Sequence, residues 1–121
     1  MIIKKIAAKG NEIAVVNSDE ICISDVQSAL DFIMYIHHET GTHYIVINKE
    51  AVIEEFFNLS TKIAGEILQK FINYHFRLAI VGKFLTYTSK PLKNFIYESN
   101  QGKDIFFVST EEEAIEKLSK A

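Results

Sequence analysis

The chain has 121 residues, 48% of them hydrophobic and 24% charged, the size and composition of one soluble globular domain spanning residues 1–121. Its formal net charge of −3 gives no basic field, so we expect no nucleic-acid partner. No run of residues approaches the roughly 18 apolar residues of a spanning helix, and the N-terminus lacks the apolar core of a signal peptide. We therefore expect a cytoplasmic protein without membrane insertion, and the single cysteine, Cys22, allows no internal disulfide.

The N-terminal quarter predicts a hairpin followed by a helix. β-branched residues dominate Ile2 to Ala8 and Glu12 to Val16, with a glycine-containing turn between them. Ser24 followed by Gln27 is a capping-box pattern, which predicts a helix that begins there and ends near Gly41. We expect this helix to direct the following residues inward: Val26, Ala29, Leu30, Ile33, Met34 and His37.

Three short aliphatic segments follow, and segments of helical periodicity separate them. The predicted strands are Tyr44 to Asn48, Arg77 to Gly82 and Ile105 to Val108. Residues 49–57 are expected to form an irregular connection, and helices are expected over 56–75, from Ser89 to Gln101, and after Thr110. Because strands that alternate with helices are joined by crossovers, we expect an α/β fold with a mixed, mostly parallel five-stranded sheet, an N-terminal antiparallel hairpin and about four helices.

The predicted helix over 56–75 is the element around which the rest of the chain is organised. Its apolar residues recur at three- and four-residue intervals, which predicts a buried stripe. Members of the stripe are Ala64, Ile67, Leu68, Phe71 and His75, and Ile72 beside it is also expected to be buried. Gly65 lowers helix propensity, so we expect it to allow close approach of a neighbouring backbone.

Two sets of segments carry resemblances to known families. The segments Tyr44 to Ile47, Phe56 to Ser60, Arg77 to Gly82 and Ile105 to Leu118 together resemble the STAS domain of anti-sigma factor antagonists and sulfate transporters. The segments Asp25 to Asp31, Asn58 to Thr61, Gly65 to Phe71 and Phe95 to Asn100 resemble more closely an uncharacterised bacterial group, domain-of-unknown-function family 4180. The second resemblance implies no function. The first implies a non-catalytic module that binds a regulatory protein or a small ligand around the start of the helix near Ser60.

The resemblance to the STAS domain also indicates which residues form the contact surface. The implied partner-binding or regulatory residues are Asn58, Ser60, Thr61, Lys83, Thr88 and Ser89. In anti-sigma factor antagonists the helix begins with an Asp-Ser-Ser-Gly-like turn whose first serine is phosphorylated, but here Leu59 occupies the position of that serine. Phosphate would then need Ser60 or Thr61, close to the acidic Glu54 and Glu55. The simpler interpretation is that Asn58 or Ser60 caps the helix.

The sequence indicates no metal and no cofactor. His37, His38 and His43 lie close together, but adjacent histidines point about 100° apart on a helix and no cysteine joins them. His75 is expected to serve the end of the helix over 56–75. The five glycines are scattered and form no phosphate-binding loop.

Our first hypothesis is a non-catalytic regulatory or binding module that contacts a protein partner or a small ligand, with no catalytic residue of its own. A second hypothesis is a small-ligand or acyl-transfer enzyme that uses Ser60 as nucleophile and a histidine as base, although no Gly-x-Ser-x-Gly elbow surrounds Ser60. A third is a homodimeric structural protein that buries an exposed Phe56, Phe57 or Phe84 against a second copy.

Overall fold

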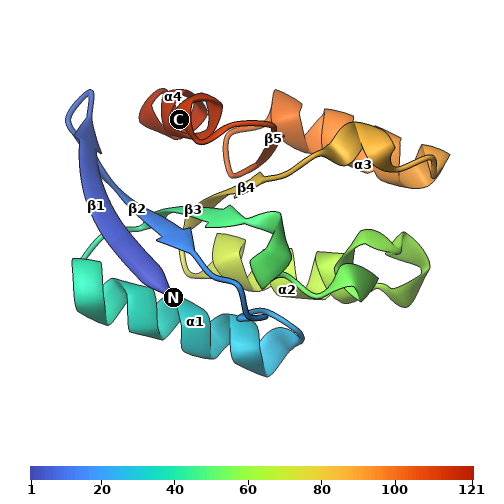
Figure 1. The fold of residues 1–121 in the computed structure, drawn as a ribbon, viewed down its shortest axis with the longest axis horizontal. Coiled ribbons are helices and arrows are strands. Elements are labelled where there is room, and N and C mark those ends of the chain that lie inside the picture. Colours follow the sequence, from blue (N-terminus) through green and yellow to red (C-terminus); the bar gives the residue numbers. More distant parts are fainter.

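The computed structural model describes all residues, 1–121, and contains one five-stranded sheet in the order β1-β2-β3-β4-β5 (Figure 1). The first strand pairs antiparallel with the second, and the remaining neighbours pair in parallel. The strands are β1 (Ile2–Ala8), β2 (Asn11–Asn17), β3 (Tyr44–Asn48), β4 (Arg77–Val81) and β5 (Ile105–Val108). The predicted mixed, mostly parallel sheet with an N-terminal antiparallel hairpin is confirmed.

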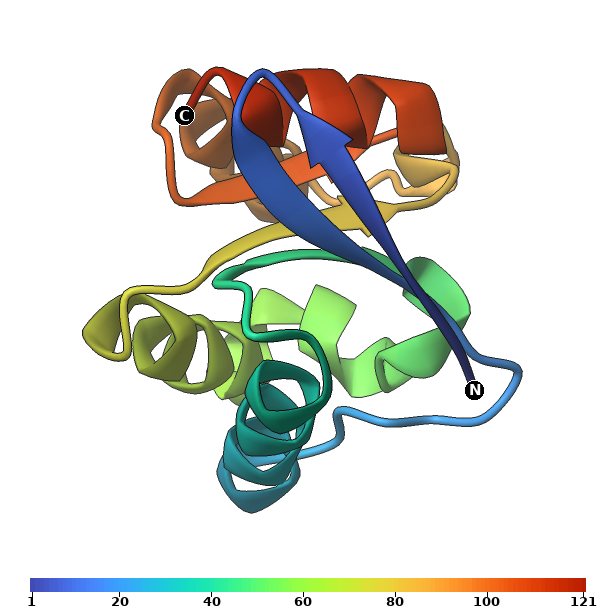
Figure 2. The same ribbon diagram turned by 90° about the vertical axis from the view of Figure 1, so that its left-hand side faces the viewer.

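Four α-helices complete the fold, as predicted. They are α1 (Val26–Thr40), α2 (Ile63–Asn73), α3 (Lys90–Gln101) and α4 (Glu111–Ser119). Helices α1 and α2 pack together below the sheet, α3 lies along β5, and α4 covers the opposite face (Figures 1 and 2). None of these helices combines the length and the apolar character needed to cross a membrane.

Side chains of the parallel strands alternate between two cores. In β3, Ile45 and Ile47 face the core shared with α1 and α2, and Val46 faces α4. Both faces are therefore covered, which explains why these strands are continuously aliphatic. On the α4 side, β4 contributes the small Ala79, which is buried in the same core as Ala114, and the partly buried Val81.

The hairpin turn has the backbone that its sequence favours. Lys9 and Gly10 both have positive φ angles, 51° and 83°. Two successive left-handed residues match the right-handed twist of the flanking strands, which is why such turns close tight hairpins. The turn predicted between the first two strands is confirmed.

Helix α1 differs from its prediction at its cap and on its buried face. Asp25 rather than Ser24 is the N-cap: its carboxylate accepts a hydrogen bond from the Ser28 backbone N–H at 2.8 Å, and the Ser28 hydroxyl accepts one from the Asp25 backbone N–H. The fully buried residues are Ala29, Phe32, Ile33 and Ile36. The prediction that Met34 and His37 point inward is wrong, because the buried stripe includes Phe32 and Ile36 and leaves both of these side chains exposed.

Four short 3-10 turns occupy the connections at the carboxyl ends of β3 and β4. They are η1 (Lys49–Ala51), η2 (Glu54–Phe57), η3 (Leu59–Thr61) and η4 (Phe84–Thr86). The helix predicted over 56–75 therefore does not start at Phe56 or near Ser60. Lys62 adopts a left-handed conformation with φ of 65°, which ends η3 and allows α2 to begin only at Ile63.

The predicted stripe of α2 is confirmed for Ala64, Ile67, Leu68 and Phe71, which are buried. Ile72 is 38% exposed and His75 is exposed, so these two predictions are wrong. Gly65 lies on the exposed side, and no atom outside the neighbouring helix backbone lies within 4 Å of the position its Cβ would take. The expected close approach at Gly65 is therefore also wrong.

Candidate functional site

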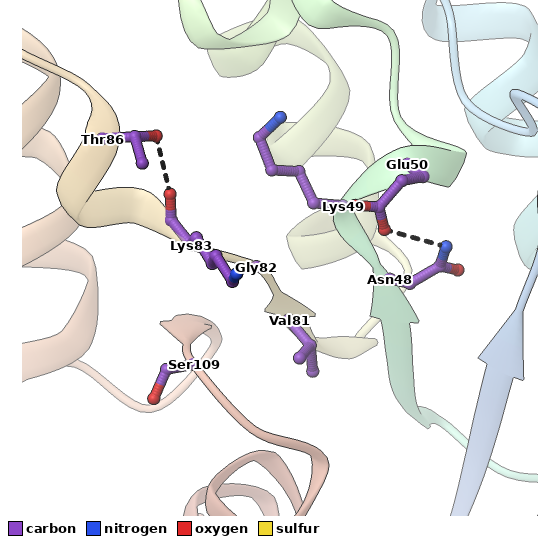
Figure 3. A pocket seen from close by; sticks show the side chains of 8 residues that line it. All are labelled: Asn48, Lys49, Glu50, Val81, Gly82, Lys83, Thr86 and Ser109. Atoms are coloured by element: carbon purple, nitrogen blue, oxygen red, sulfur yellow. Dashed lines mark hydrogen bonds between the residues drawn. The ribbon is translucent and has the colours of Figure 1, made fainter.

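Polar residues that follow three parallel strands meet at the carboxyl ends of those strands. They line an open hollow of about 570 Å³, drawn in Figure 3. Its lining residues are Asn48, Lys49, Glu50, Val81, Gly82, Lys83, Thr86 and Ser109. Residues 48–50 form one side of this hollow, and residues of the β4 end, the following loop and the β5 end form the other (Figure 3).

The Asn48 side chain continues the pairing of β2 and β3 beyond their last residues. Its amide oxygen accepts a hydrogen bond from the Ser18 backbone N–H at 2.9 Å, and its amide nitrogen donates to the Ser18 carbonyl at 2.7 Å. The same nitrogen lies 3.2 Å from a carboxylate oxygen of Glu50. Because its amide is occupied, Asn48 shapes the hollow. The Ser109 hydroxyl donates to the Glu113 carboxylate at 3.3 Å, so the exposed Lys83 is the donor left for a ligand there.

Lys49 connects the hollow to the neighbouring turns. A Cβ at Gly82 would lie 2.8 Å from the Lys49 Cβ, so the absence of a side chain at Gly82 lets Lys49 cross the end of β4. The Lys49 Nζ lies 3.1 Å from Glu54 Oε1 and 5.0 Å from the ring centroid of Phe57. It also lies 5.2 Å from the Tyr87 ring centroid, so the ammonium group has both an anionic and an aromatic partner.

The ionisation of Lys49, Glu54 and Tyr87 is coupled. Burial raises the pKa of Tyr87, and the Glu54 carboxylate contributes further. Burial is also the largest single influence on the pKa of Lys49 and would lower it, but Tyr87 and Glu54 together raise that pKa above its ordinary value. For Glu54 the effect of burial is outweighed by Tyr87 and Lys49, which lower its pKa. Lys49 and Glu54 are thus held as an ion pair beside a neutral phenol.

The predicted residues of the first segment are exposed and bonded to one another. The Asn58 side-chain oxygen accepts hydrogen bonds from the Ser60 backbone N–H at 3.2 Å and from the Ser60 hydroxyl at 2.7 Å. The Thr61 hydroxyl donates to the Asn58 carbonyl at 2.8 Å. These bonds cap the 3-10 turn η3, and Leu59 packs against the core. The local capping role considered for Asn58 is present, although it serves η3 rather than α2.

The predicted residues of the second segment have separate roles. Lys83 lines the hollow, and Ser89 is the N-cap of α3, where its hydroxyl accepts a hydrogen bond from the Leu92 backbone N–H at 3.3 Å. Thr88 is exposed between them. Of the six residues predicted from the resemblance, only Lys83 lines the hollow.

Aromatic contacts hold the two segments together. The Phe57 ring stacks on Tyr87 with centroids 5.4 Å apart and lies 5.8 Å from Phe84. The Tyr87 hydroxyl donates a 2.8 Å hydrogen bond to the Glu54 carboxylate. Residues 58–61 and 83–89, which we call the loop surface, therefore have a common packed base. Leu85 on this surface is 98% exposed.

The same aromatic packing contradicts the interface expected for a homodimer. Phe56 and Phe57 are 1% and 4% exposed, and Phe84 is half-buried. The Phe84 ring meets Phe107 edge-on at 5.4 Å. These rings stabilise the junction of η2, η4 and β5. Phe56 and Phe57 are therefore too buried to form the exposed apolar contact that the sequence predicts, and Phe84 is only partly exposed.

The geometry also does not support a nucleophilic Ser60. Its hydroxyl donates to Asn58, and it precedes the start of α2, whereas His75 follows the other end of that helix. His37 and His38 lie in the last turn of α1, and His43 precedes β3. The histidines thus lie toward the amino ends of the parallel strands, whereas Ser60 lies toward the carboxyl ends. They are out of reach as a base for Ser60. No group of three or more His, Cys, Asp or Glu side chains is arranged to hold a metal ion.

Comparison with known proteins identifies the family. A family model described as Domain of unknown function (DUF4180) matches residues 8–118. This chain belongs to the DUF4180 family. No curated protein matches it. The crystal structure of a proposed anti-sigma factor antagonist from Thermotoga maritima is similar to this DUF4180 chain at 14% sequence identity and a TM-score of 0.48, covering 97% of this chain and 92% of that one.

Several site residues of this DUF4180 chain were missed by reasoning from sequence: Asn48, Lys49, Leu85 and Ser109. A signal for two of them was present, because Asn48 ends one predicted strand and Ser109 follows another. Carboxyl ends of parallel strands meet at the same edge of a sheet, so polar residues at those positions are natural candidates for a site. Nothing in the sequence distinguishes Leu85 from a buried leucine.

Proposed function

We propose that this DUF4180 protein is a non-catalytic regulatory or binding module, STAS-like and cytoplasmic, that docks a protein partner on its loop surface. The observation that carries the proposal is Leu85, a large apolar side chain that is 98% exposed on a loop whose base is packed. Exposed apolar groups surrounded by polar ones are typical of contact sites. Residues 1–121 act together as one such module.

The surroundings of Leu85 have the make-up of a small protein interface. Leu85 contributes to a second hollow of about 280 Å³, whose lining includes Phe84, Ile96 and Phe107. This hollow shares Gly82 and Ser109 with the polar hollow. A partner would therefore meet an apolar centre next to hydroxyl and ammonium groups, and Ser60 and Thr61 would lie at its rim.

A small polar ligand is the second candidate occupant, and the polar hollow favours it. Lys83 and Ser109 present an ammonium group and a hydroxyl group at this hollow. The hollow is wide open, so a ligand bound there would keep much of its surface in water and bind weakly by itself. For this reason we place the protein partner first.

The test replaces exposed residues with glutamate and compares the proteins that co-purify from the native host. Leu85→Glu and Ser60→Glu alter the loop surface. Met34→Glu is the matched control, because Met34 is an apolar residue 49% exposed on α1. We expect one partner to co-purify with the wild-type chain and with the control, and to be lost with Leu85→Glu.

Binding is then measured with the purified partner. Removing a fully buried leucine contact is worth roughly 1.5–3 kcal/mol, so Kd should rise about tenfold or more for Leu85→Glu. Equal affinity of the wild-type chain and both loop-surface variants would rule out this surface as the docking site. Loss of binding by Met34→Glu alone would move the site to α1.

A further inference from the structure

A second cluster of polar side chains lies at the amino ends of the parallel strands, opposite to the loop surface. His43, Tyr44, His75 and Arg77 line an open hollow of about 370 Å³. The parallel register pairs Tyr44 with Arg77, and the Arg77 backbone N–H donates a 2.8 Å hydrogen bond to the His43 carbonyl. The strand pairing itself therefore brings these residues together.

The local backbone also holds His75 in place. Its φ angle is 62°, and its N–H donates to the Ile72 carbonyl at 3.0 Å. The next residue, Phe76, donates to the Phe71 carbonyl at 2.8 Å and is buried. These two bonds form a Schellman motif, which ends α2 in a fixed geometry. His75 thus reaches the hollow from a rigid helix end.

The hollow is rich in positively charged or chargeable donors. The His43 ring lies 4.8 Å from the His37 ring and 4.6 Å from the Phe76 ring, measured between centroids. None of the lining residues is a carboxylate. The closest acid is Asp104, whose oxygen lies 3.7 Å from Arg77 Nε, longer than a hydrogen bond. Most of the guanidinium donors therefore remain available.

We propose that this hollow binds an oxyanion of the phosphate class, held by the Arg77 guanidinium and the imidazoles of His43 and His75. All three groups donate hydrogen bonds. Phosphate oxygens accept several charge-assisted bonds at once, which suits a fork-shaped guanidinium flanked by imidazoles. This site is independent of the loop surface, because it lies at the amino ends of β3 and β4.

Protonation of the cluster should control the affinity. The titratable groups that act on His43 are His37 from α1 and His75 from the end of α2, and Arg77 from β4 lines the same hollow with Asp104 beside it. An anion among them offsets their mutual repulsion and favours protonated imidazoles. We therefore expect tighter binding at pH 6.5 than at pH 8.

The test is a titration with inorganic phosphate, followed by the NMR signals of the histidine side chains at pH 6.5. Sodium chloride at matched ionic strength is the reference. The signals of His43 and His75 should shift saturably, and that of His38, which is 87% exposed and paired only with Glu39, should not. Absence of saturation, or an equal shift of His38, would overturn the site.

Three variants test the site, two that should weaken phosphate binding and one that should strengthen it. Arg77→Gln should weaken phosphate binding about tenfold, since a charged hydrogen bond contributes roughly 1.5–3 kcal/mol. Asp104→Asn should strengthen it, because the competing carboxylate is removed. His75→Asn removes an imidazole while tolerating the left-handed backbone, and should also weaken binding. Unchanged affinity in Asp104→Asn and His75→Asn, with the fold intact, contradicts the proposal even if Arg77→Gln fails to fold.

A second arm distinguishes the source of the anion. O-phosphoserine is titrated in place of inorganic phosphate under the same conditions. Tighter binding of phosphoserine would identify a phosphate carried on a larger molecule, and weaker binding would identify free phosphate. Failure of both to bind would refute the site without affecting the loop surface.

Discussion

Two glycines of this protein lie in opposite steric environments. Gly65 is exposed on α2 with open space where its Cβ would be, whereas a Cβ at Gly82 would lie 2.8 Å from the Lys49 Cβ. Neither glycine has a positive φ angle. The effect of adding a methyl group at each position is therefore set by space and by helix propensity, and the signs should be opposite.

Gly65→Ala should stabilise the protein. Alanine in a helix interior is favoured over glycine by about 0.8–1.0 kcal/mol, and it also restricts the unfolded chain. We expect the free energy of unfolding in urea to rise by about 1 kcal/mol. A decrease would show that the α2 surface contacts something that the methyl group obstructs.

Gly82→Ala should destabilise the protein. The new Cβ is rigidly attached to the backbone, and the atom that it meets is itself next to a backbone, so either η1 or the end of β4 must shift. Overpacking of this kind costs about 1–3 kcal/mol. Urea unfolding measures the loss. Unchanged stability would mean that η1 moves freely relative to β4.

At the scale of elements, helix α3 closes one edge of the sheet. The edge strand β5 is closed by Asn100 of α3, whose amide donates to the Phe107 carbonyl at 3.0 Å and accepts from the Phe107 backbone N–H at 2.8 Å. One side chain thus replaces a neighbouring strand. Unpaired strand edges favour association with other chains, so this contact also protects the monomer.

Asn100→Ala should therefore have two effects. A half-buried N–H and C=O lose their partners, which costs about 1–3 kcal/mol in the free energy of unfolding. The freed β5 edge should also increase aggregation, measured by light scattering. Asn94→Ala, at an exposed position of the same helix, is the control and should change neither quantity. Equal behaviour of the two variants would show that the amide clamp contributes nothing.

At the scale of the whole molecule, acid should weaken the fold in two stages. Burial lowers the pKa of His43 below its ordinary value of 6.5, and the charges of His37 and His75 add to this. The pKa values of Glu54 and Asp25 are also lowered, the latter because its carboxylate accepts hydrogen bonds from Ser28. Each of these groups binds its proton more readily in the unfolded chain than in the folded one.

The first stage belongs to the histidine cluster. The contribution of His43 is fully present above pH 6.5 and is lost as the pH falls toward the lower pKa of the folded state. We expect a small decrease in the unfolding midpoint between pH 7.5 and 5.5 in phosphate-free buffer. His43→Gln should remove most of this slope, and an unchanged slope would assign it to other groups.

The second stage follows below pH 4.5, where Glu54 begins to be protonated in the unfolded chain. Glu54→Gln should reduce this slope without affecting the first stage. Urea unfolding between pH 5 and pH 3 measures it. Because the Glu54 side chain is largely exposed, we expect a modest effect.

Local pattern was enough to predict the framework of this protein. The order of strands and helices, the hairpin, the parallel sheet and the helices predicted from Ser89 and after Thr110 are all present, with Ser89 and Thr110 as their N-caps. These features depend on residues within a few positions of one another, so periodicity and capping chemistry specify them. Predictions failed where a single backbone angle intervened, as at Lys62, whose left-handed conformation delays the start of α2.

Only the tertiary structure decided which residues come together on the two surfaces. The stacking of Phe57 on Tyr87, the position of Lys49 across Gly82 and the approach of His43, His75 and Arg77 join residues that are far apart in the sequence. Each depends on which strands are neighbours and in what register, which no local pattern records. The sequence by itself determined the elements of this protein, and the pairing of its strands determined where its chemically active groups meet.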